Sequence, residues 1–181
     1  MKHKKVIISG GPGFGKTSII DELESRQFIC MPEVSRSIIK EQLALGGDVL
    51  PWKNLEAFSN CLFDKRVMQF EDAPMHQWVF FDRAIHDILA YMDRINLKVP
   101  NEFLSKLSGC LYHSDVFIVP PWKEIFRNDD ERQEDYEAAC EIHEYILNTY
   151  FKFGYNVIEL PKVSVVERAD FIINHIGISK N

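Results

Sequence analysis

A glycine-rich turn near the N-terminus constrains the fold of this chain more than any other feature of its sequence. Four of the six residues from Gly10 to Gly15 are glycine, and the turn joins an apolar run to the pair Lys16-Thr17. Glycine loses more conformational freedom on folding than any other residue, so a cluster of glycines indicates a backbone that turns tightly or approaches a ligand closely. The sequence predicts a strand before this turn and a helix after it, which is the setting of a phosphate-binding loop.

The spacing Gly10-x-x-x-x-Gly15-Lys16-Thr17 fits the pattern of a P-loop. In such a loop the backbone N–H groups and the positive end of the helix attract phosphate. Lys16 is then expected to reach the β- and γ-phosphates, and the Thr17 hydroxyl to coordinate Mg²⁺. A dinucleotide fingerprint does not fit, because it would need glycine at position 16. We therefore predict that ATP and Mg²⁺ bind at Gly10, Gly11, Pro12, Gly13, Phe14, Gly15, Lys16, Thr17 and Ser18.

The charge balance of the chain limits the partners that it can attract. The 21 lysine and arginine residues are outnumbered by 27 acidic residues, which gives a net charge of −6. An acidic chain has no general attraction for nucleic acid or anionic lipid, so phosphate binding must be local, and neither partner is predicted. The apolar run near the N-terminus is too short for a signal peptide, and none approaches the ~20 residues of a membrane span. We expect a cytoplasmic protein.

Short apolar runs alternate with longer helical patterns along the sequence. The predicted strands are Lys5–Ser9, Phe28–Met31, Trp78–Asp82, Asp115–Pro120 and Asn156–Leu160. The predicted helices are Lys16–Ser25, Val34–Leu45, Leu55–Glu71, Arg83–Ile95, Glu102–Leu111, Glu134–Phe153 and a last one that opens at Ser164. The strands are apolar throughout, as in a sheet that is buried on both faces. This alternation predicts a three-layer α/β fold with a five-stranded parallel sheet, formed by residues 1–181 as a single domain.

An acid–arginine pair follows the third predicted strand. Asp82 lies at the carboxyl end of that strand, where ligands of open α/β sheets bind, and it suits a role in supporting Mg²⁺. Many nucleotide hydrolases place a glutamate after this aspartate, but here the next residue is Arg83. Arginine is not a base, but it can hold a phosphoryl group through two donors, which favours phosphoryl transfer over hydrolysis. The alternative is a surface ion pair at a strand end.

Glu33 lies just beyond the second predicted strand, with Arg36 three residues further along. If this strand neighbours the glycine-rich loop, Glu33 faces the γ-phosphate and could accept the proton of an attacking hydroxyl. The alternative is an acid in the first turn of a helix, stabilised there by the helix dipole. Under the first interpretation Glu33, Arg36 and Arg83 bind the acceptor.

The most polar segment, around residues 127–135, is predicted to be part of a short lid over about 122–135. Arg127 and Arg132 could close over a transferring phosphoryl group, stabilise its charge and exclude water. The alternative is a solvated charged face. The predicted catalytic residues are therefore Lys16, Glu33, Asp82, Arg83, Arg127 and Arg132, with Thr17 and Asp82 as the metal ligands.

Three further side chains are ambiguous in the sequence. Trp52 and Trp122 could stack on a base or a sugar, or could belong to the core. His86, which follows Asp82-Arg83 by one turn together with Asp87, could line an acceptor pocket or be a structural histidine.

The sequence resembles the small AAA-domain ATPases related to the kinase half of ribosylnicotinamide kinases, within the P-loop nucleotide and nucleoside kinase group. The resemblance covers almost the whole chain, through the segments ISGGPGFGKTS, MPEVSRSIIKEQLALGGDVLPW, FFDRAIHDILAYM, DVFIVPPWKEIFRNDDERQED and SVVERADFIINHI. It implies a sheet ordered 2-3-1-4-5 with a lid. Asp82-Arg83 looks like the acid–arginine pair of nucleoside kinases, and Glu33 is similar in placement to their base.

These observations predict an ATP- and Mg²⁺-dependent phosphotransferase that acts on a small hydroxyl-bearing metabolite, with nucleoside-like molecules foremost. The alternative is a regulatory ATPase that hydrolyses nucleotide slowly and signals its bound state to a partner, and an exposed apolar helix face would favour it. The sequence leaves open the acceptor, the choice between ATP and GTP, and whether the protein is a monomer or a homodimer.

Overall fold

The computed structural model describes residues 3–127 and 134–178 and contains the predicted parallel sheet. The strands are β1 (Lys5–Ser9), β2 (Ile29–Met31), β3 (Val79–Asp82), β4 (Asp115–Ile118) and β5 (Asn156–Glu159). All four neighbouring pairs are parallel, and the order is β2-β3-β1-β4-β5. The sheet order and the α/β fold class are therefore confirmed.

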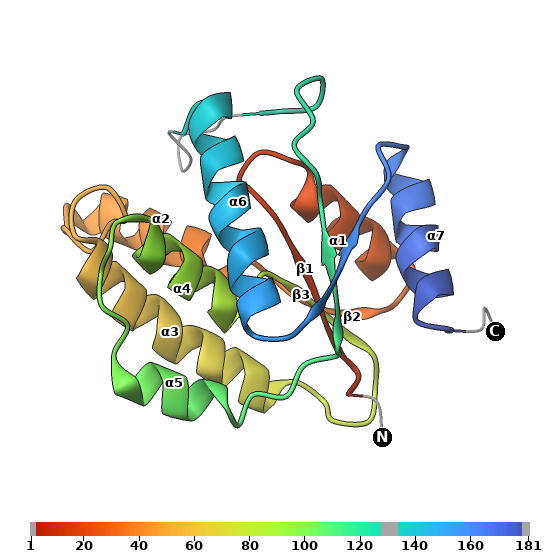
Figure 1. Ribbon diagram of the computed structural model, residues 1–181, viewed down its shortest axis with the longest axis horizontal. Coiled ribbons are helices and arrows are strands. Elements are labelled where there is room, and N and C mark those ends of the chain that lie inside the picture. The colour runs from red at the N-terminus through yellow and green to blue at the C-terminus, as the bar shows by residue number, and fades with distance from the viewer. Residues whose placement is uncertain (1–2, 128–133, 179–181) are drawn as a thin grey trace.

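Helices cover both faces of this sheet (Figure 1). They are α1 (Lys16–Ser25), α2 (Val34–Leu45), α3 (Leu55–Asp72), α4 (Ile85–Arg94), α5 (Asn101–Leu107), α6 (Tyr136–Lys152) and α7 (Val165–His175). Most ends agree with the sequence to within two residues. The largest difference is in α5, which was predicted to end at Leu111 and ends at Leu107. The start of α4 lies two residues later than predicted because Arg83 takes a left-handed conformation (φ 69°), which a helix cannot include.

The sheet separates two hydrophobic cores, because alternate residues of a strand point to opposite faces. In β1, Ile7 packs into a core formed with α2, α3, α4, α5 and α6. Its neighbours Val6 and Ile8 pack into a second core with α1 and α7. Figure 1 shows α1 and α7 together on one side of the sheet and α2 to α5 on the other. Strands buried in this way need apolar residues at every position, which explains their continuous apolar runs.

The carboxyl ends of the central strands meet at one edge of the sheet. In the register, Ile8 pairs with Asp82 on β3, and Ser9 pairs with Ile118 on β4. The glycine-rich loop follows Ser9 directly, so it leaves the sheet beside Asp82. No helix within residues 3–127 and 134–178 combines the length and apolarity that a membrane crossing requires.

Candidate active site

Neighbouring segments enclose the glycine-rich loop so closely that two of its glycine positions leave no room for a side chain. A Cβ atom on Gly10 (φ +128°) would lie 2.6 Å from the carbonyl oxygen of Val119. One on Gly13 (φ +77°) would lie 2.6 Å from the ring of Phe126 and 2.9 Å from the carbonyl oxygen of Arg127. Both positions therefore require glycine for space as well as for backbone conformation. The first part of the predicted lid, Trp122 to Arg127, thus packs on this loop, and the Arg127 side chain is exposed.

Lys16 folds back over the loop. Its Nζ donates to the carbonyl oxygens of Gly10 (3.0 Å) and Gly11 (2.6 Å), and its side chain is buried. The loop is also anchored to α6, because the Gly11 N–H donates to Nδ1 of His143 (3.4 Å). The Phe14 ring packs against the rings of Phe126 and His143. The predicted binding role of Phe14 therefore rests on its main chain, while its side chain anchors the loop.

Thr17 and Asp82 lie close together, as a shared metal ion would require. The Thr17 hydroxyl donates to Oδ2 of Asp82 at 3.5 Å, and Oδ1 of Asp82 is buried without a hydrogen-bond partner within the described residues. Burial and the nearby charge of Glu33 raise the pKa of Asp82, although Lys16 opposes them. A buried, under-coordinated carboxylate beside a hydroxyl offers the hard oxygen ligands that Mg²⁺ prefers. These two residues fit the predicted ion.

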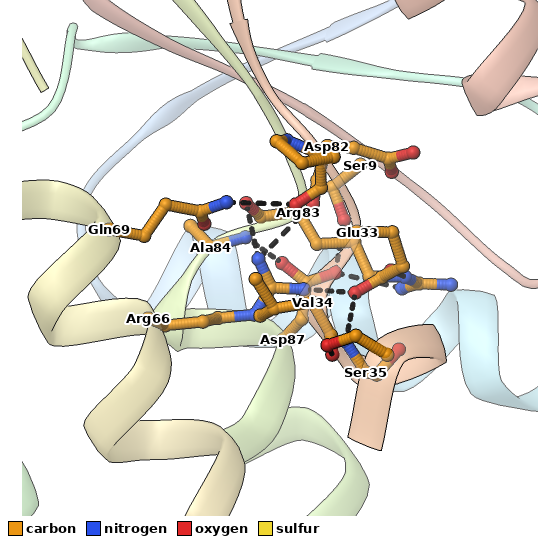
Figure 2. Close-up of polar contacts among 12 residues, drawn as sticks. Ser9, Glu33, Val34, Ser35, Arg66, Gln69, Asp82, Arg83, Ala84 and Asp87 are labelled. Carbon is orange, nitrogen blue, oxygen red and sulfur yellow. Dashed lines mark hydrogen bonds and ion pairs between the residues drawn. The ribbon is translucent and has the colours of Figure 1, made fainter. Parts of the chain in front are cut away.

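Glu33 lies at the centre of a buried ion-pair cluster (Figure 2). One carboxylate oxygen pairs with Nη2 of Arg66, and the other accepts from Nε of Arg83 at 2.7 Å. The Ser35 N–H, in the first turn of α2, also donates to Glu33 (3.3 Å). Glu33 therefore caps α2, as the second interpretation of the sequence expects, and it also lines a pocket that Pro12 of the glycine-rich loop shares. Its role as a base stays a prediction.

The cluster keeps Glu33 ionised. Burial alone would raise its pKa, but Arg66, Arg83 and the Ser35 N–H outweigh burial and lower the pKa below its usual value. Glu33 is thus a carboxylate at neutral pH, able to accept a hydrogen bond or a proton.

Arg83 and Asp87 hold each other in position. Asp87 accepts from Nη1 of Arg83 (2.9 Å), from the Ala84 N–H (2.9 Å), from the Tyr150 hydroxyl (2.6 Å) and from the Ser9 hydroxyl. Burial would raise the pKa of Asp87, but the charges of Arg83 and Arg66 and the bonds from the Ala84 N–H and the Ser9 hydroxyl lower it. Asp87 therefore fixes the orientation of Arg83, whose left-handed backbone costs about 1–2 kcal/mol.

Arg66 is the main site residue that the sequence interpretation missed. It comes from α3, is only 1% exposed, and donates to the carbonyl oxygens of Asp82 (3.2 Å) and Arg83 (3.0 Å) as well as to Glu33. These bonds hold the strained backbone at the end of β3. One signal was present in the sequence, since Arg66 stands among the apolar positions of the predicted helix Leu55–Glu71.

A pocket opens from this cluster and encloses about 760 Å³, its open mouth included. Pro12 of the glycine-rich loop forms part of its wall, and Trp52 lies in the wall rather than in the core. The pocket brings together the predicted residues Glu33, Arg36 and Arg83 with Arg66, Asp87, Tyr91 and Glu134. Arg127 is not among its lining residues, and Arg132 lies outside the described residues.

His86 is a structural histidine rather than a pocket residue. Its ring packs against the rings of Tyr112, Tyr150, Phe153 and Tyr155 and is almost fully buried. Burial lowers its pKa to about 4, with Asp87 opposing the shift. Its sequence neighbour Asp87 lines the pocket instead.

This burial predicts a pH-dependent stability. Between pH 4 and about 6.5 the unfolded chain binds a proton at His86 that the folded chain does not, so the free energy of unfolding rises with pH in this window. At ~1.36 kcal/mol per pKa unit the full contribution of His86 is about 3 kcal/mol. His143, with a pKa of about 4, adds in the same direction. The free energy of unfolding is measured with denaturant at several pH values. Between pH 4 and about 6.5 it should rise less steeply with pH for His86→Gln than for wild type. An unchanged slope, equal to that of the exposed control His76→Gln, would contradict the buried, neutral state.

Comparisons with known proteins agree with this geometry. Residues 5–168 match the model of a family described as AAA domain. Among curated protein sequences, none matches the chain significantly. Deoxyadenosine kinase from M. mycoides with bound products is similar in structure, with a TM-score of 0.66, 16% identity, and coverage of 95% of this chain and 97% of that one.

Two further solved structures are similar. Thymidylate kinase from Candida albicans has a TM-score of 0.63 and 15% identity, with 97% of this chain and 91% of that one covered. NadR in complex with NR has a TM-score of 0.71 and 19% identity, with 98% of this chain covered. The chain spans about half of NadR, since 53% of that chain is covered. At these identities the structural likeness shows the fold.

Proposed function

The chain belongs to this family of AAA domains, and from that premise we propose that it is an ATP- and Mg²⁺-dependent phosphotransferase that acts on a small hydroxyl-bearing metabolite. One observation carries the proposal: the ionised Glu33 lies between two arginines in a pocket whose wall includes the glycine-rich loop. A hydroxyl bound at Glu33 would lie beside the terminal phosphate of a nucleotide held by that loop. Proximity of this kind is the main contribution that a protein makes to phosphoryl transfer.

The charges of the pocket support an uncharged acceptor. Its wall carries three carboxylates (Glu33, Asp87 and Glu134) and three guanidinium groups (Arg36, Arg66 and Arg83). With no excess positive charge, the pocket favours a neutral alcohol over a molecule that already bears phosphate. Two of the similar structures bear the names deoxyadenosine kinase and thymidylate kinase, so nucleosides are the first acceptors to test.

In the proposed reaction, Glu33 accepts the proton of the acceptor hydroxyl while the hydroxyl oxygen bonds to the γ-phosphorus. The bond between that phosphorus and the bridging oxygen breaks, and ADP leaves. The lowered pKa makes Glu33 a weak base, so the proton moves late in this step, as suits a loose transition state. Arg83 lies between Glu33 and Asp87, where its remaining N–H donors can stabilise the transferring group.

The donor side is assigned to the loop. Lys16 would exchange its bonds with the Gly10 and Gly11 carbonyls for phosphate oxygens. Thr17 and Asp82 would hold Mg²⁺, which would supply positive charge to the phosphates. We propose residues 1–181 as one domain, with residues around 122–135, including Arg127 and Arg132, as a lid.

The alternative, a slow regulatory ATPase, has less support. It would present an exposed apolar helix face to its partner. The large exposed apolar side chains are instead spread over several elements of the described chain, for example Leu45 on α2, Met68 on α3 and Phe151 on α6. Scattered apolar residues of this kind are normal on protein surfaces.

A screen of acceptors tests the proposal. Nucleosides and other small alcohols are incubated with the protein and ATP·Mg²⁺, and ADP release is measured. We expect one acceptor class to stimulate ADP release well above the basal rate, with a phosphorylated product in equal amount. Basal hydrolysis that no acceptor stimulates, with nucleotide-dependent binding of a protein partner, would favour the regulatory alternative.

A further inference from the structure

Arg168, on the first turn of α7, is a buried cation without an acidic partner in the part of the chain that the structure describes. Its side chain is 4% exposed, and Nε has no hydrogen-bond partner within residues 3–127 and 134–178. No ion pair to a described carboxylate compensates its charge, in contrast to Arg66 and Arg83. Burial without compensation lowers its pKa. Keeping a guanidinium in this state is costly, which suggests that a ligand supplies the missing partner.

Its one described side-chain partner is aromatic. The guanidinium lies over the ring of Trp122, 5.6 Å from the centroid, just beyond β4. Both groups are planar, and Trp122 is partly exposed. Planar arginine and tryptophan side chains are the ones that most often stack on nucleobases.

This pair lies at the end of the glycine-rich loop where α1 begins. A Cβ atom on Gly15 would be 3.4 Å from Nη1 of Arg168 and 3.1 Å from the side chain of Ile125. The packing of α7 on α1 fixes this position. The opposite end of the loop faces the acceptor pocket. Pro12 lies there in the pocket wall, and Nζ of Lys16 contacts the carbonyl oxygens of Gly10 and Gly11.

A triphosphate on this loop has one possible direction in the proposed reaction. Its terminal phosphate must face Glu33 and the acceptor pocket, so its nucleoside end must leave past Gly15 and the exposed Thr17 and Ser18. We propose that Arg168 and Trp122 form the binding platform for the base of the donor nucleotide. The base stacks on the partly exposed ring of Trp122, and the guanidinium that lies over this ring supplies the positive charge that attracts the acceptor atoms of the base. This inference rests on the proposed nucleotide binding and extends it to the nucleoside.

The test separates the base from the phosphates. Calorimetry measures the binding of ATP·Mg²⁺ and of tripolyphosphate·Mg²⁺ to wild type, Arg168→Met and Trp122→Leu. The methionine keeps the apolar stem of Arg168 and removes its donors. We expect either variant to weaken ATP binding by about tenfold to a hundredfold, the range of one lost stacking contact, and to leave tripolyphosphate binding unchanged. Arg26→Met, which removes an arginine paired with Asp170 on the same α1–α7 surface, is the matched control and should bind ATP as wild type does.

Two results would overturn the platform. The first is ATP binding by folded Arg168→Met and Trp122→Leu that equals that of wild type. The second is a loss of ATP and tripolyphosphate binding to the same extent in both variants, which would make Arg168 a phosphate ligand. Trp122 is partly exposed, so its variant keeps the test valid if Arg168→Met does not fold. Failure of wild type to bind either ligand would instead contradict the proposed function itself.

Discussion

Replacing Glu33 with glutamine is expected to lower turnover by about 10²- to 10⁴-fold, the usual contribution of a general base. Glutamine has nearly the same shape, and its one carbonyl oxygen can still accept from Ser35 and Arg66. Its NH2 group would face Arg83 and cannot take a proton. ATP binding should change little, because the loop and Lys16 carry it. Steady-state turnover with the acceptor found in the screen, together with calorimetric ATP affinity, measures both effects.

Glu134→Gln is the matched control, because Glu134 lines the same pocket but is not in the ion-pair cluster. Breaking a buried pair can cost about 3–5 kcal/mol, so the folded fraction of Glu33→Gln must be checked by denaturant unfolding. Full turnover by the folded variant would show that Glu33 acts only as a helix cap and a partner for arginine.

Lys16→Ala is expected to have the second largest effect. Lys16 is the lysine that the loop offers to the phosphates, and removing one preorganised donor of this kind costs on the order of 10²- to 10³-fold in rate. Triphosphate binding should also weaken, since the charge-assisted contact is lost. The alanine also removes two hydrogen bonds to the loop carbonyls, so the unfolding free energy should fall modestly.

Calorimetry with ATP·Mg²⁺ and acceptor-stimulated ADP release check this prediction. Lys40→Ala, which removes an exposed lysine on α2, controls for the loss of one positive charge. Equal ATP affinity in Lys16→Ala and wild type would remove the nucleotide-binding interpretation of the loop, whatever the outcome at Glu33.

The fold was predictable because its signals are local. Each strand is a run of apolar residues, and the glycine-rich loop requires a strand before it and a helix after it. The strand order came from the resemblance, since periodicity does not determine which strands are neighbours. Asp82 and Glu33 were likewise found from their positions just after apolar runs.

The remaining site residues depend on contacts between distant parts of the chain. Arg66 meets Glu33 across 33 positions, and Tyr150 meets Asp87 across 63. No local pattern connects such pairs. The left-handed conformation of Arg83 was also unexpected, because only the bonds from Arg66 and Asp87 make it tolerable. His86 and Asp87 are adjacent in α4 but point in different directions. His86 packs among aromatic rings, whereas Asp87 lines the pocket.

The two cores on opposite faces of the sheet also bear on how such a protein can diverge. The acceptor pocket rests on the core that includes Ile39, Phe58 and Ile88, whereas the loop and α1 rest on the core that includes Phe14 and Ile19. Substitutions that reshape one layer leave the packing of the other intact. Related proteins could therefore change their acceptor through substitutions on α2, α3 and α4 while the nucleotide-binding layer keeps its packing. The sheet thus separates the packing of the nucleotide-binding layer from the packing of the acceptor layer.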